Sequence, residues 1–142
     1  MYRELQPLRQ ALSQQLQADL FPAVAGVDAN KLLETYLDRL TMYIGVDVAD
    51  RTFTALAEDA SGQVLGTLEA CPNRPQGFRR FMAWAEALRD KHGLRILAVA
   101  CETAGIFYWA LWDFLAQQPG LARVLYNPRT TKHMGGVLSK RV

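Results

Sequence analysis

The sequence predicts an α/β domain built on a mixed five-stranded sheet with flanking helices. Three short apolar runs between residues 42 and 68 are joined by tight turns, as expected for an antiparallel meander. Apolar runs then alternate with helical patterns, as expected for strands added in parallel through helical crossovers. A length of 142 residues fits one domain with a short appendage, and the 50% apolar content excludes a disordered or fibrous chain.

Residues 1–41 are predicted to form a helical hairpin that precedes the sheet. Leucines recur at spacings of three and four as far as Leu20, which marks one apolar stripe on a glutamine-rich helix. Phe21 and Pro22 interrupt this helix, and Asp28 is a suitable N-cap for a second helix that reaches Leu40. The hairpin either packs on its own domain or pairs with the same hairpin of another subunit, so residues 1–41 are a candidate dimerisation element.

The remaining elements follow in order from Met42. Strands are expected over residues 42–48, 52–57, 63–68, 94–101 and 121–126. The fourth of these runs is apolar enough to lie at the centre of the sheet. Helices are expected between Asn73 and Gly93, between Gly105 and Pro119, and from Asn127 onward, where the chain is basic.

Two acidic residues stand at positions where an α/β sheet places a ligand. Asp47 lies inside the first apolar strand, and Glu102 directly follows the fourth. If these two strands are neighbours, both carboxylates meet at one end of the sheet, where Mg²⁺ or Mn²⁺ favours clusters of oxygen ligands. The alternatives are a buried aspartate bonded to the backbone and a glutamate that caps the next helix.

Four segments in this order resemble the DEDD transposases, a family of insertion-sequence enzymes grouped with the Piv-type DNA invertases. They are Tyr43 to Ala49, Asn73 to Phe78, Cys101 to Tyr108 and Val124 to Pro128. The resemblance covers about residues 42–142 and implies an RNase H-like fold similar to that of the Holliday-junction resolvase RuvC. It implies DNA transposition and recombination as the function, through metal-dependent phosphodiester chemistry.

The resemblance assigns Asp47 and Glu102 to the first two acidic residues of the family's catalytic and metal-binding tetrad. The third and fourth belong to an Asp-x-x-Asp motif, and no Asp or Glu occurs after Asp113. Residues 42–142 are therefore expected to be an N-terminal domain truncated before that motif. The complete enzyme is expected to use magnesium or manganese, whereas this chain alone should bind the metal weakly and should not cleave or join DNA.

A non-catalytic module for nucleic-acid binding or oligomerisation, with the same RNase H-like fold, is the second hypothesis. A sugar-kinase or actin-like nucleotide-binding half is a weaker third, because such folds place glycine in the first hairpin and the segment from Asp47 to Thr52 has none.

The charge distribution indicates a polyanionic partner. Five of the 16 basic residues and none of the 14 acidic ones lie between Pro119 and Val142. We expect Arg129, Lys132, Lys140 and Arg141 to follow a DNA backbone; solvent-facing charge is the alternative. Some members of the family use a guide RNA encoded by their element, and the resemblance leaves that partner open.

The remaining features indicate a cytoplasmic protein. No apolar run reaches the length of a membrane span, and Cys71 and Cys101 match no metal or redox spacing, so no disulfide is expected. Cys101 is expected to be a small buried side chain, and His92 and His133 to be surface or core residues without a metal. The aromatic residues Trp84, Tyr108, Trp109 and Trp112 are expected in the core rather than as platforms for stacking bases.

Overall fold

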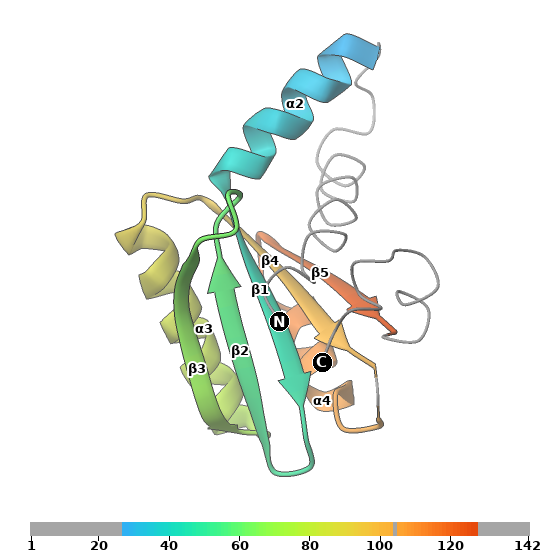
Figure 1. Cartoon of the computed structure of the whole chain (residues 1–142). Helices are drawn as coiled ribbons and strands as arrows, with labels where there is room; N and C mark the ends of the chain where they lie inside the picture. The colour runs from blue at the N-terminus through green and yellow to red at the C-terminus, as the bar shows by residue number, and fades with distance from the viewer. Residues whose placement is uncertain (1–26, 104, 128–142) are drawn as a thin grey trace.

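A five-stranded mixed sheet forms the centre of the protein (Figure 1). The computed structural model describes residues 27–103 and 105–127. The strand order is β3-β2-β1-β4-β5, with antiparallel pairing of β1 with β2 and of β2 with β3, and parallel pairing of β1 with β4 and of β4 with β5. The strands are β1 Thr41–Val48, β2 Thr52–Glu58, β3 Val64–Pro72, β4 Ile96–Glu102 and β5 Leu121–Tyr126. The predicted meander followed by parallel strands is confirmed, and the arrangement agrees with an RNase H-like fold.

The third strand runs four residues beyond its predicted end at residue 68. Between the Cα pairs Phe53–Cys71 and Ala55–Leu68, β2 advances two residues while β3 advances three, so β3 carries an extra residue. Ala70 has a φ of 52°, a conformation uncommon for a residue other than glycine. This bulge lets β3 continue to Pro72 through residues that lack strand propensity.

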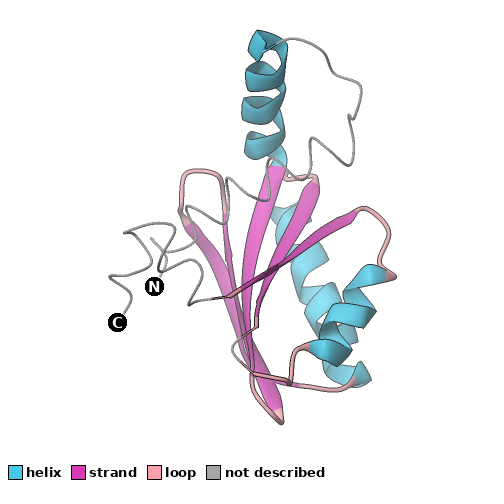
Figure 2. Ribbon diagram, turned by 90° about the vertical axis from the view of Figure 1, so that its right-hand side faces the viewer, coloured by secondary structure: helices cyan, strands magenta, loops and turns pink. Residues whose placement is uncertain are grey.

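Two helices cover one face of the sheet, as Figure 2 shows from the side. Helix α3 spans Pro75–Lys91, as predicted, and α4 spans Trp109–Ala116. Helix α4 begins later than expected because the chain first turns between Gly105, with a φ of 147°, and Tyr108. The core between helices and sheet includes Phe53, whose ring meets that of Phe81 edge-on at 5.8 Å.

Helix α2 (Val27–Leu40) runs directly into β1 at the end of the sheet where that strand begins (Figure 1). The hydroxyl of Tyr43 donates a hydrogen bond to Asp38 Oδ1 at 2.5 Å, and the Arg95 N–H donates to the Leu40 carbonyl at 2.8 Å. The second helix of the predicted hairpin is thus confirmed, whereas the first helix and the last basic helix lie outside the described residues. No helix in the described ranges is long and apolar enough to cross a membrane.

The junction between β3 and α3 is closely packed around Gly77. A Cβ atom at this position would lie 1.7 Å from the carbonyl oxygen of Pro72. The carbonyl of Gly77 also accepts a hydrogen bond from the Cys71 thiol at 3.2 Å. Only glycine allows the first turn of α3 to approach the end of β3 this closely.

Both cysteines are free and buried, and the predicted burial of Cys101 is confirmed. Cys101 lies on β4 beneath the helices, and burial raises the pKa of its thiol from 9.0 to about 12, although the positive charge of Arg123 lowers it. Burial likewise raises the pKa of Cys71. The thiols are therefore packing groups and not nucleophiles.

Replacing Gly77 by alanine should lower the free energy of unfolding by about 3 kcal/mol, because the methyl group forces the backbone of β3 and α3 apart. Gly93→Ala is the control: Gly93 has a φ of +68° but open space around it, so only about 1 kcal/mol of conformational strain is expected. Urea denaturation of the two variants measures both values. Equal losses of unfolding free energy in the two variants would show that the close contact with Pro72 does not restrict the residue at position 77.

The stability of the protein should fall as the pH rises above about 9, and Cys101 should cause part of this fall. The thiol releases its proton near pH 9 in the unfolded chain and near pH 12 in the folded one, so the folded state holds the extra proton between these values. The expected contribution is at most about 1.4 kcal/mol per pH unit. Denaturation of Cys101→Ala and the parent protein from pH 8 to 11 tests this, and identical slopes would contradict it.

Candidate functional site

The two predicted acidic residues lie on adjacent parallel strands. Val46 of β1 and Cys101 of β4 are Cα partners, and Asp47 and Glu102 are the next residues on their strands. Side chains alternate along a strand, and Val46 and Cys101 pack in the core beneath the helices. Asp47 and Glu102 therefore both face the opposite side of the sheet, where neighbouring strands lie about 4.8 Å apart.

Glu102 also contacts the fifth strand. It is the Cα partner of Tyr126, whose hydroxyl donates to Glu102 Oε2 at 3.5 Å, the outer limit of a hydrogen bond. Glu102 is half-buried, whereas Asp47 is exposed beside Thr54 of β2. The ends of β1, β4 and β5 thus carry Asp47, Glu102 and Tyr126 to one end of the sheet, which we call the carboxyl edge.

The donor set of the carboxyl edge fits part of a site for a hard divalent cation. Asp47 and Glu102 supply carboxylate oxygens, the ligands that Mg²⁺ and Mn²⁺ prefer, from one face of two paired strands. Among residues 27–103 and 105–127, no group of three or more His, Cys, Asp and Glu side chains is placed to hold a metal. Two carboxylates alone leave most of an octahedral shell to water.

Asn73 links the carboxyl edge to the helical layer. Its Nδ2 donates to the carbonyl oxygens of Ala49 at 3.1 Å and Asp50 at 3.3 Å, in the turn that follows Asp47, and to that of Phe107 at 3.1 Å, in the segment that follows Glu102. Its backbone N–H donates to the Arg51 carbonyl at 2.8 Å. One side chain thus ties together the two segments that leave the acidic residues.

The sequence did not predict this role for Asn73. The sequence places the residue at the entry to α3 and in a segment that resembles the family, but its three acceptors lie 23, 24 and 34 residues away along the chain. All three acceptors are main-chain carbonyls, which every residue type supplies. No side-chain pattern could therefore have signalled the contact.

The segment between Glu102 and α4 exposes apolar side chains, and so does the first residue of α4. The exposed fractions are 72% for Ile106, 41% for Phe107 and 56% for Trp109, and the ring of Trp109 stacks on Tyr108 at 5.2 Å. The prediction that Trp109 belongs to the core is wrong, because the helix begins at Trp109 and its first turn points this residue outward. Trp84, Tyr108 and Trp112 are half-buried.

The basic residues of the C-terminal stretch divide into two groups. Arg123 lies on β5, with its guanidinium 3.8 Å from the centre of the Trp112 ring and its Nη1 donating to the Trp112 carbonyl at 3.0 Å, so it stabilises packing. The four residues predicted to contact nucleic acid, Arg129, Lys132, Lys140 and Arg141, lie outside the described residues, as does His133. His92 is exposed, which is the first of the two predicted alternatives, surface or core.

Asn73→Asp should destabilise the protein more than Asn73→Ala does. Aspartate keeps the shape of asparagine but points an acceptor-only carboxylate at three carbonyl oxygens, whereas alanine removes the donor; we expect losses of about 3 and 2 kcal/mol, respectively. Gln76→Ala, at an exposed position in the first turn of α3, is the control and should change stability by less than about 0.5 kcal/mol. Thermal and urea unfolding measure the order. An aspartate variant as stable as the parent would refute the linking role.

Comparison with known proteins identifies the family of the chain. Residues 44–141 match the family model of the DEDD transposases of the IS110 type, described as a transposase. No curated protein matches the chain. The matched range includes both acidic residues, the Asn73 segment and all five strands except the start of β1. The chain belongs to the IS110-type DEDD transposase family.

Proposed function

We propose that this chain is the N-terminal part of a DNA transposase whose complete form cleaves and joins DNA at the carboxyl edge by metal-dependent phosphodiester chemistry. The observation that carries the proposal is the placement of Asp47 and Glu102 on one face of two paired strands, in a chain of this family. A divalent cation held there would stabilise negative charge on the entering or leaving oxygen of a phosphodiester.

The chain's own residues would orient this site. Asp47 and Glu102 would supply two ligands, and the Tyr126 hydroxyl lies 3.5 Å from Glu102 Oε2 on the neighbouring strand. Asn73 would keep the turn after Asp47 and the segment after Glu102 at a constant separation. With two carboxylates, the 142-residue chain would bind the cation weakly and would not cleave DNA by itself.

The partners in this proposal are DNA, approached in part by Arg129, Lys132, Lys140 and Arg141, and a second copy of the chain, paired through residues 1–41. A guide RNA is a third partner that members of this family suggest. The alternative function is a non-catalytic nucleic-acid-binding or oligomerisation module. It is favoured because no group of three or more His, Cys, Asp and Glu side chains in the described ranges is placed to hold a metal.

Manganese binding tests the acidic pair. We expect Mn²⁺ to broaden the amide resonances of β1 and β4 near Asp47 and Glu102 at millimolar concentration, and the double variant Asp47→Asn/Glu102→Gln to remove this effect. Glu69→Gln/Glu86→Gln removes the same charge from exposed positions on β3 and α3 and should leave the broadening unchanged. Broadening that persists in the first variant would reject the metal site.

A nicking assay on supercoiled and branched DNA tests the activity of the chain. With Mg²⁺ or Mn²⁺, the 142-residue chain should give no nicking above background, because two ligands hold the metal too loosely to position it. Nicking that is abolished by Asp47→Ala would overturn this expectation and would show that the pair suffices for catalysis.

A further inference from the structure

We propose that a hollow at the carboxyl edge, between the β1–β2 turn and the start of α3, binds a phosphate group of the DNA backbone. The proposal rests on the proposed function, because it takes DNA as the partner. The hollow has a volume of about 440 Å³ and opens to solvent at the carboxyl edge. It is lined by Asp50, Arg51, Thr52, Pro72, Asn73 and Arg74.

Two guanidinium groups make the hollow suitable for phosphate. Arg51 and Arg74 are both exposed. Asp50 supplies the one negative charge in the lining. A guanidinium presents parallel N–H donors that match two oxygens of a phosphate, so a pair of them favours the phosphodiester over a neutral ligand.

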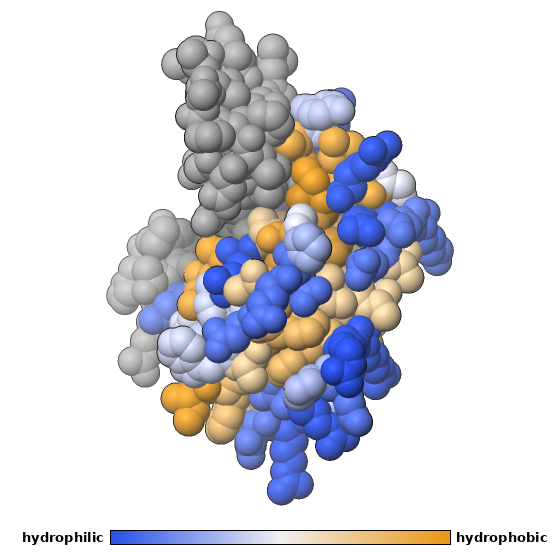
Figure 3. Space-filling model, turned by 180° about the vertical axis from the view of Figure 1, so that it is seen from behind, coloured by the Kyte–Doolittle hydropathy of each residue, from blue (hydrophilic) through white to orange (hydrophobic). Residues whose placement is uncertain are grey.

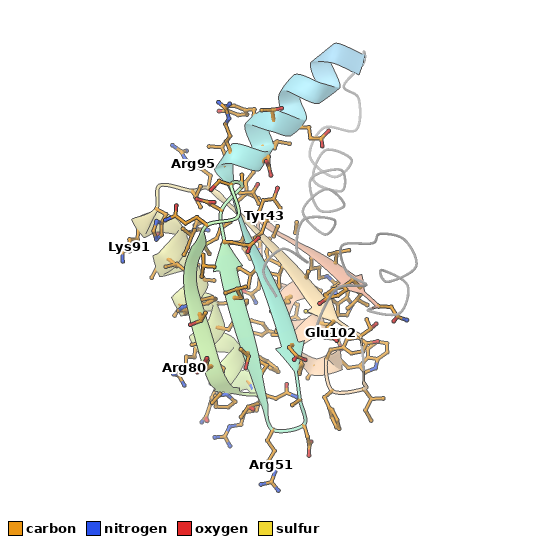
Figure 4. All side chains as sticks on the ribbon, viewed as in Figure 1. Tyr43, Arg51, Arg80, Lys91, Arg95 and Glu102 are labelled. Atoms are coloured by element: carbon orange, nitrogen blue, oxygen red, sulfur yellow. The ribbon has the colours of Figure 1, made fainter. Side chains whose placement is uncertain are left out.

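Hydrogen bonds join the hollow to the two segments that follow the acidic residues. Asn73, which lines it, donates to the carbonyls of Ala49 and Asp50 on one side and of Phe107 on the other. Thr52 and Pro72, also in the lining, are Cα partners of the β2–β3 ladder. Figure 4 shows Arg51 at the tip of the β1–β2 turn, at the same end of the sheet as Glu102.

Arg51 and Arg74 offset the repulsion between the acidic pair and DNA. Asp47 and Glu102 repel a polyanion, so DNA can approach them only if nearby positive charge offsets the repulsion. Arg51 and Arg74 supply that charge at the carboxyl edge. Seen from the helical side, hydrophilic side chains gather at this end of the molecule, beside a smaller apolar patch (Figure 3).

The test compares two double variants of equal charge change. Arg51→Ala/Arg74→Ala removes the proposed phosphate ligands, and Lys91→Ala/Arg95→Ala removes two exposed positive charges at the opposite end of the sheet (Figure 4). Affinity for a labelled 30-base-pair DNA duplex is measured from 50 to 200 mM salt. We expect the first variant to bind about tenfold more weakly with a salt slope smaller by about 1 to 2, and the second to change affinity less than about threefold.

Arg51→Lys/Arg74→Lys keeps the charge and should recover part of the lost affinity, which separates a loss of charge from a loss of fold. Equal weakening in the two alanine variants would overturn the phosphate site while leaving DNA binding intact. Absence of DNA binding by the parent chain at 50 mM salt would reject the proposed function itself and the phosphate site with it. Binding to an RNA duplex of the same sequence but not to DNA would overturn the assignment of the partner.

Discussion

The parallel pairing of β1 with β4 is the constraint on which the functional end of this protein depends. Val46 lies opposite Cys101, and each of these buried residues is followed by an acidic one. The two carboxylates therefore lie side by side and face away from the helices. A shift of one residue in either strand would turn one carboxylate into the core beneath α3 and α4. The apolar residues of that core therefore determine where the two charges lie, since they fix which face of each strand is buried.

The helices contribute to the site through the segments that connect them to the strands and not through their own side chains. Helix α3 begins where β3 ends, and the close contact of Gly77 with Pro72 brings Asn73 against the β1–β2 turn. The amide of Asn73 then reaches the segment before α4. Packing in the core and geometry at the carboxyl edge are thus linked by one short junction between a strand and a helix.

The sequence predicted the parts of the structure that depend on local pattern. The strands, α3 and the position of Asp47 and Glu102 at one edge followed from apolar periodicity and from the rule for ligand sites in α/β sheets. The sequence did not predict the features that depend on the conformation of the folded backbone. The bulge at Ala70 extended β3, the turn after Gly105 exposed Trp109, and the contacts of Asn73 are with main-chain carbonyls, which leave no trace in residue identity.

The strand order has a consequence for the route by which the chain folds. The β1–β2–β3 meander joins segments that are close in sequence, whereas the pairing of Val46 with Cys101 must close a long loop that contains β2, β3 and α3. Loop closure of this kind slows folding, because its entropic cost comes before the contacts that repay it. The two carboxylates therefore come together only when the pairing of β1 with β4 forms.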